Sequence, residues 1–123
     1  IMATIQQKLP ETEIILLSVF PMNESPRFVR TPNHRNNDSI NQLNNLLSNL
    51  SKKSVTYLNI HDSLCDESGH LPLTCTIDGL HLNITGYRVV SEILSVYLQW
   101  DGIIFQDNNA RLRFQITVYY YCT

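Results

Sequence analysis

The sequence predicts a single α/β domain built around a parallel sheet, and three observations support this. The chain has 123 residues, the length of one ordinary domain. Hydrophobic residues make up 43% of the chain and charged residues 16%, which is typical of a globular protein. Helix-like and strand-like segments alternate along residues 1–99, and such alternation is typical of an α/β layer with parallel strands.

The first two elements follow from apolar spacing and from a proline. Residues 1–9 carry apolar side chains at near-helical spacing, and Pro10 ends this predicted helix because it lacks an N–H. Residues 13–20, EIILLSVF, form a continuous apolar run that is too short for a typical helix. This run is therefore predicted to be a parallel strand buried on both faces.

A second helix and a second strand follow. The helix is predicted from about Asp38, with Asn37 or Asp38 as its N-cap. The second strand is predicted at residues 54–60, SVTYLNI, and a loop covers residues 61–82. The apolar stripe of the helix comprises Ile40, Leu43, Leu46, Leu47 and Leu50.

The last predicted helix covers residues 85–98 and is capped by Asn83 or Thr85. Residues 100–123 do not continue the alternation; two β-like runs flank the turn-prone sequence QDNNA, which predicts a hairpin. We therefore assign this tail to a segment separate from residues 1–99. The buried stripe expected on the last helix comprises Val89, Val90, Ile93, Leu94 and Tyr97.

Charge and cysteine content exclude several classes of partner and site. The formal net charge of −2 argues against nucleic acid as a partner. No apolar run reaches the ~20 residues that a membrane-spanning helix needs. Cys65, Cys75 and Cys122 lack the spacing of a zinc site, and unpaired thiols are a better interpretation than a Cys65–Cys75 disulfide.

Asp78 and His81, at the end of the 61–82 loop, are candidate catalytic residues. An aspartate three residues before a histidine can hold the imidazole through Nδ1, which fixes the tautomer and leaves Nε2 as a base. The alternative is that Asp78 only caps the turn while His81 packs. The position after a strand favours catalysis, because ligand sites in open α/β sheets lie beyond the carboxyl ends of strands. Gly79 is expected to allow a tight turn between the two residues.

Other polar residues offer weaker candidates. Ser63, in NIHDSL, and Ser18 are expected to be ordinary serines, and His34 and Arg35 are expected to be exposed. A cluster of histidines and aspartates could bind a metal ion and support a metal-dependent phosphoesterase, but it contains no helical histidine pair. The cluster comprises His61, Asp62, Asp66, His70, Asp78 and His81.

The string DGLHLNITGY, from Asp78 onward, resembles the last conserved block of the SGNH (GDSL-type) esterase/lipase family. EIILLSVFP resembles that family's fourth strand, INQLNNLL the helix after it, and residues 55–83 the fifth strand and the approach to the histidine. The resemblance covers roughly residues 1–98. It implies the C-terminal portion of a three-layer α/β/α fold, with two of its five parallel strands. It also implies that Asp78 and His81 belong to a Ser-His-Asp triad that uses no metal or organic cofactor.

The sequence departs from the family in one respect. It contains neither the G-D-S block, which carries the nucleophilic serine, nor the G-x-N-D block. The resemblance therefore implies that the complete enzyme hydrolyses a small-molecule, carbohydrate or lipid ester, whereas this chain is expected to be inactive alone. The alternative is a non-catalytic fragment or interaction module, which would self-associate through an exposed sheet edge.

Overall fold

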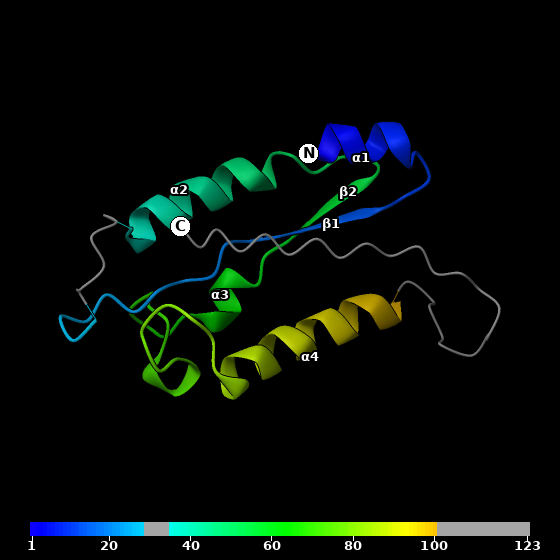
Figure 1. Ribbon diagram of the computed structural model, residues 1–123. Coiled ribbons are helices and arrows are strands. Elements are labelled where there is room, and N and C mark those ends of the chain that lie inside the picture. The colour runs from blue at the N-terminus through cyan, green and yellow to red at the C-terminus, as the bar shows by residue number, and fades with distance from the viewer. Residues whose placement is uncertain (29–34, 101–123) are drawn as a thin grey trace.

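A computed structural model of the chain describes residues 1–28 and 35–100 (Figure 1). Helices and strands alternate in these residues, which confirms the predicted α/β class. The elements are α1 (Met2–Lys8), β1 (Ile14–Leu17), α2 (Asn37–Ser48), β2 (Val55–Leu58), α3 (His61–Leu64), the 3-10 helix η1 (Leu73–Cys75) and α4 (Ile84–Trp100).

The two strands form a parallel sheet, as predicted. Ile14 lies opposite Val55, and Leu17 lies opposite Leu58. In Figure 1, α2 lies on one side of the strands and α4 on the other. This helix–sheet–helix order gives the described residues three layers.

Both strands are shorter than predicted, and β1 is not buried on both faces. The N–H of Ser18 still donates to the carbonyl of Leu58 at 3.0 Å. The chain then leaves the sheet, and the backbone N–H and carbonyl of Val19 bond to the side chain of Asn44 instead of a strand. Of the four β1 residues only Ile14 is buried, and the other three are half-buried. The expectation of full burial was wrong because the sheet has only two strands in the described residues.

The hydrophobic core lies between the strands and α4. Val90 is its buried α4 member, and the predicted stripe residues Val89, Ile93 and Leu94 are partly buried and pack against it. Tyr97, the fifth residue of the predicted stripe, is half-buried and is not part of this cluster. The other buried members come from α3, η1 and the connections beside them. They are Ile60, Leu64, Leu71 and Cys75.

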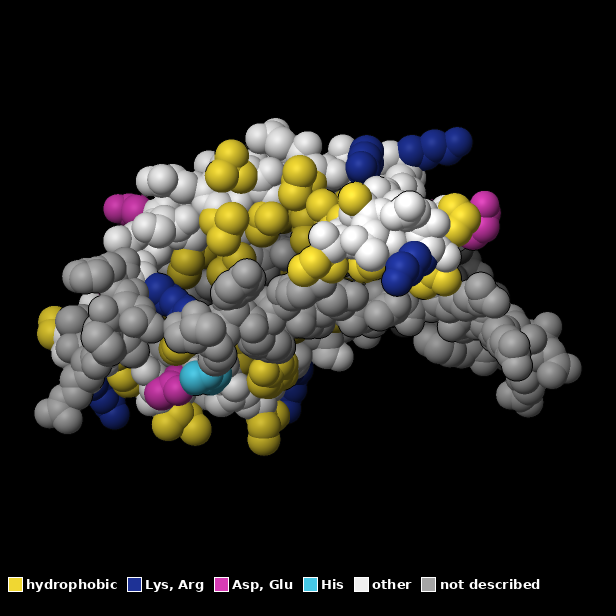
Figure 2. Space-filling model, turned by 45° about the horizontal axis from the view of Figure 1, so that its top comes forward, with side chains coloured by type: hydrophobic (Ala, Val, Ile, Leu, Met, Phe, Trp, Pro, Cys, Tyr) yellow, Lys and Arg dark blue, Asp and Glu magenta, His cyan; other side chains and the backbone are white. Residues whose placement is uncertain are grey.

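The apolar stripe of α2 is present but largely uncovered. Leu43 and Leu46 are 44% and 67% exposed, and Leu50, which the prediction included in the stripe but which lies after the end of the helix, is 42% exposed. Figure 2 shows hydrophobic side chains, in yellow, on the face that carries α1 and α2. The two faces of the sheet therefore differ: the side of α4 carries the hydrophobic core, whereas apolar side chains on the side of α2 stay exposed.

Several boundaries differ from the predictions for local reasons. The N-cap of α2 is Asn36, whose side chain accepts the backbone N–H of Ser39 at 2.7 Å, and not Asn37 or Asp38. The predicted 61–82 loop contains α3 and η1, which are too short to show apolar periodicity. The helix α4 begins at Ile84, directly after Asn83, and runs further than predicted.

No helix among the described residues combines the length and the apolar character needed to cross a bilayer. The hairpin predicted for the tail lies outside the described residues, and so does Cys122.

Candidate active site

Asp78 and His81 form a closed turn just before α4. Nδ1 of His81 lies 2.6 Å from Oδ2 of Asp78. The other carboxylate oxygen, Oδ1, accepts the backbone N–H groups of His81 at 2.8 Å and Leu80 at 3.0 Å. Both oxygens of Asp78 are thus used within the turn, and the carboxylate holds the imidazole from the Nδ1 side.

The carboxyl group of Asp78 is held in its ionised form. Partial burial raises the pKa of Asp78, but hydrogen bonds from the His81 ring and from the backbone of His81 and Leu80 lower it further, to well below its usual range. An ionised carboxylate can only accept hydrogen bonds, so the hydrogen between the two side chains is carried by Nδ1. In the neutral ring Nε2 then carries the lone pair, as a general base requires.

The site is open to solvent. The side chains of His81 and Asp78 are 57% and 52% exposed. A reactant can therefore approach the ring, in contrast to the buried histidine His61.

Gly79 allows the turn for two reasons. Its φ of 82° lies in the left-handed region that favours glycine. A Cβ at this position would also lie 2.6 Å from the ring of Phe28, which packs directly against the turn. The expectation that Gly79 permits the tight turn is confirmed.

Thr76 holds the backbone of the turn through its hydroxyl, a role that the sequence did not predict. Its buried hydroxyl donates to the carbonyl of His81 at 2.7 Å and accepts the N–H of Gly79 at 3.0 Å. The hydroxyl therefore bonds both sides of the turn. The only sequence signal is a threonine two residues before an aspartate, a common arrangement in loops.

Asn83 joins the turn to α4. Its side-chain oxygen accepts the N–H groups of Thr85 at 2.9 Å and Gly86 at 3.2 Å, and its amide donates to the carbonyl of Thr74 at 2.9 Å. Of the two caps predicted for this helix, Asn83 therefore has the side-chain contacts and Thr85 does not.

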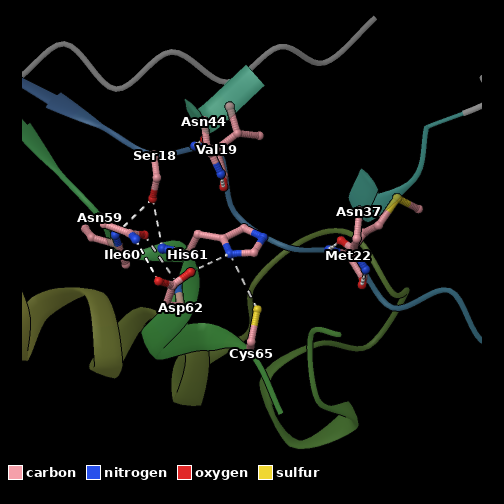
Figure 3. A network of polar contacts seen from close by, with 10 residues as sticks. All are labelled: Ser18, Val19, Met22, Asn37, Asn44, Asn59, Ile60, His61, Asp62 and Cys65. Atoms are coloured by element: carbon pink, nitrogen blue, oxygen red, sulfur yellow. Dashed lines mark hydrogen bonds and ion pairs between the residues drawn. The ribbon is translucent and has the colours of Figure 1, made fainter. Parts of the chain in front are cut away.

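Ser18 and Ser63 have the ordinary roles expected of them. Ser18 is buried at the end of β1, and its oxygen accepts the N–H groups of Ile60 at 2.9 Å and His61 at 2.8 Å (Figure 3). These bonds join the carboxyl ends of the two strands. Ser63 is exposed on α3.

The clustered histidines and aspartates do not converge on one point. His61 is buried and contacts Asp62 at 3.1 Å, whereas Nε2 of His70 lies 3.4 Å from Oε2 of Glu24. In the part of the chain that the structure describes, no three His, Cys, Asp or Glu side chains are grouped to hold a metal ion. The residues that suggested a metal-dependent phosphoesterase are therefore dispersed.

The remaining candidates are placed as follows. Cys65 and Cys75 are free thiols. Burial is the main cause that raises the pKa of Cys65, and the negative charges of Asp62 and Asp66 raise it further. Arg35 is half-buried, in contrast to the expected exposure. His34 lies outside the described residues.

Comparisons with known proteins support the fold. No family model matches the chain. No curated protein matches it either. Among solved structures, one described as "a putative platelet activating factor from Streptococcus pneumonia" is 34% identical, with a TM-score of 0.75. The match covers 79% of this chain and 46% of the streptococcal chain, so this chain spans just under half the length of that structure. The likeness supports a hydrolase-like α/β fold for this chain.

Proposed function

We propose that His81 is the base of a Ser-His-Asp triad and Asp78 the carboxylate that orients it, and that the complete enzyme hydrolyses acyl esters. The observation that carries the proposal is the 2.6 Å contact between Nδ1 of His81 and Oδ2 of Asp78 on an exposed turn. The SGNH-type resemblance of the DGLHLNITGY string and the likeness to the streptococcal structure support the same reaction class.

In the proposed mechanism, Nε2 of His81 takes the proton of the serine hydroxyl as the serine oxygen attacks the ester carbonyl. The imidazolium then gives this proton to the leaving alkoxide, which departs as the alcohol, and an acyl-serine remains. In the second half His81 takes a proton from water, hydroxide attacks the acyl-serine, and the proton returns to the serine. Asp78 stays ionised throughout and stabilises the imidazolium.

We further propose that residues 1–99 are the C-terminal portion of the hydrolase domain. The chain contains no G-D-S and no G-x-N-D sequence, so the serine nucleophile would come from strand–helix units other than these. The streptococcal structure supports the view that these residues are a portion of a larger domain, since more than half of its length lies outside the match. The ester would be a small-molecule, carbohydrate or lipid ester.

The test begins with the transcript. Sequencing upstream of the Ile1 codon defines the longest in-frame product, which is expressed and labelled with a fluorophosphonate that reacts with activated serines. We expect labelling and hydrolysis of p-nitrophenyl acetate. In His81→Ala both should fall by about 10³-fold or more, because the base is removed.

The matched control is His70→Ala, since the imidazole of His70 also pairs with a carboxylate, that of Glu24, and not with Asp78. It should leave labelling unchanged. Labelling that is unchanged in His81→Ala would contradict the proposal, as would a product without a serine block.

One observation favours a second candidate, an interaction module. Three exposed leucines, Leu43 and Leu46 on α2 and Leu50 just after it, form an apolar face that the described residues leave uncovered. Such faces commonly mark sites of protein association. In that case oligomers would form in solution and no serine labelling would be found.

A further inference from the structure

The segment Met22–Asn23, which follows β1, connects three separate parts of the molecule. The N–H of Asn23 donates to the carbonyl of Gly79, inside the Asp78–His81 turn, at 2.8 Å. The carbonyl of Met22 accepts the N–H of Leu71 at 3.2 Å. The same carbonyl accepts the side-chain amide of Asn37, on α2, at 2.8 Å. The segment therefore lies between the helix and the turn.

Two buried asparagines on α2 hold the backbone that leads into this segment (Figure 3). Asn44 accepts the N–H of Val19 at 2.7 Å and donates to its carbonyl at 2.9 Å. Asn37 makes the same pair of bonds to Met22, at 2.9 and 2.8 Å. An amide side chain has one acceptor and one donor group, as the backbone of a strand residue does. Each asparagine therefore bonds both the N–H and the carbonyl of one backbone residue, as a neighbouring strand would.

The side chain of Asn23 fixes the other end of the segment. Its Nδ2 donates to the carbonyl of Leu71 at 2.7 Å, a buried bond, and its Oδ1 accepts the N–H of Ser25 at 3.0 Å. Asn23 is only 8% exposed, so the loss of these bonds would leave buried groups unsatisfied. The side-chain bonds therefore determine where the backbone N–H that reaches Gly79 can lie.

We infer that Asn23 is a positioning residue for the Asp78–His81 pair. Its backbone N–H holds the Gly79 carbonyl, and its side chain anchors that N–H to Leu71 and Ser25. The residue touches neither reacting side chain and acts on the turn through Gly79. The inference rests on the proposed function, because a catalytic Asp78–His81 pair needs a single geometry and the His81 ring is exposed to solvent.

The test measures the state of the His81 ring by long-range proton–nitrogen NMR of the full 123-residue chain, in alkaline solution where imidazoles are neutral. We expect wild type to hold the hydrogen on Nδ1, facing Asp78. In Asn23→Ala the Nδ1–H form should lose population about fivefold or more relative to the Nε2–H form, the effect of losing roughly one buried hydrogen bond.

Three further variants make the result specific. Asp78→Asn gives the ring signature of a broken pair. Asn49→Ala is the matched control, because Asn49 donates to the carbonyl of Asn45 on the exposed surface of α2 and has no contact with the segment. Asn23→Asp keeps the acceptor for Ser25, but it replaces the donor to Leu71 with a carboxylate oxygen and so also adds a negative charge at this buried position. It is the informative variant if Asn23→Ala does not fold.

The inference is supported if Asn23→Ala or Asn23→Asp shifts the ring toward the Asp78→Asn signature while Asn49→Ala does not. It is overturned if the folded Asn23 variants keep the wild-type tautomer, or if Asn49→Ala shifts it equally. This readout needs no activity. Failure of the proposed function would instead appear as serine labelling that does not depend on His81, with the tautomer result unaffected.

Discussion

Asp78 holds both the ring and the backbone of His81, with Oδ2 2.6 Å from Nδ1 and Oδ1 2.8 Å from the backbone nitrogen. Because the two residues are only three positions apart, a single turn is enough to bring these atoms together. The histidine cannot rotate about its side-chain bonds without breaking the first contact. This constraint is what the following predictions test.

Replacing the carboxylate should remove catalysis and leave the fold intact. In the complete enzyme we expect Asp78→Asn to lower kcat by about 10⁴-fold, because an amide can donate to Nδ1 and so favour the wrong tautomer. Steady-state hydrolysis of p-nitrophenyl acetate measures this. Asp62→Asn is the matched control, since Asp62 lies 3.1 Å from the Nδ1 of another histidine, His61. Equal losses in both variants would argue against a special role for Asp78.

Gly79→Ala should destabilise the chain more than Gly69→Ala. Both glycines have positive φ, 82° and 77°, so both variants strain the backbone by about 1 kcal/mol. Only at Gly79 would the new Cβ meet a side chain, Phe28 at 2.6 Å, whereas nothing lies within 4 Å at Gly69. Urea unfolding should show an additional loss of about 1–3 kcal/mol for Gly79→Ala, the usual cost of overpacking.

The contribution of Phe28 can be separated from that of the backbone. Phe28→Ala should remove the additional loss in a double variant with Gly79→Ala, because the two sites are in contact and their effects are coupled. Strictly additive effects would show that the ring does not limit the turn.

Thr76→Val should lower the free energy of unfolding by about 1–3 kcal/mol. The substitution keeps the shape of the side chain but leaves the carbonyl of His81 and the N–H of Gly79 without their buried partner. Thr76→Ser keeps the hydroxyl and should cost less. Urea unfolding followed by circular dichroism measures both variants, and equal losses would mean that the hydroxyl contributes no more to stability than the methyl group does.

The Asp78 contact should stabilise the chain at neutral pH and lose its effect in acid. Partial burial raises the pKa of Asp78, but its hydrogen bonds with His81 and Leu80 lower it further, below the ordinary value of 3.8. A folded-state pKa below the unfolded one gives stability that is complete above the unfolded pKa and is lost as the pH falls through the folded pKa.

The measurement is the difference in free energy of unfolding between wild type and Asp78→Asn across pH. It should be of the order of 1 kcal/mol or less near neutrality, because half of the Asp78 side chain is exposed and solvent screens the charge. The difference should shrink as the pH falls below about 4. A difference that does not change with pH would show that the charge of Asp78 contributes nothing.

The exposed face of α2 should govern association in solution. Leu46 is 67% exposed, and Leu46→Lys places a charge in the middle of the apolar face. If this face self-associates, sedimentation velocity should show a lower oligomer fraction in the variant than in wild type. Asn41→Lys adds the same charge at an exposed polar position of α2 away from this face and should change nothing. Identical profiles for all three proteins would exclude self-association through Leu46.

Local patterns in the sequence are enough to predict the order of the elements and the contact within the candidate site. Apolar periodicity predicted α1, α2 and α4, and the β-branched runs predicted the positions of both strands. The D-x-x-H spacing predicted the contact between Asp78 and His81, since a three-residue separation leaves little conformational freedom. These features depend on neighbours within a few residues, which is why one sequence suffices to predict them.

The residues that hold that site in place come together only when distant segments of the chain pack. Asn23 and Gly79 are far apart in the chain, as are Val19 and Asn44, and nothing in their local sequence indicates that they meet. The early end of β1 has the same origin, because a side chain from α2 takes the place of a neighbouring strand. Hydrogen bonds over such distances depend on how the elements pack, and local patterns carry no information about that packing.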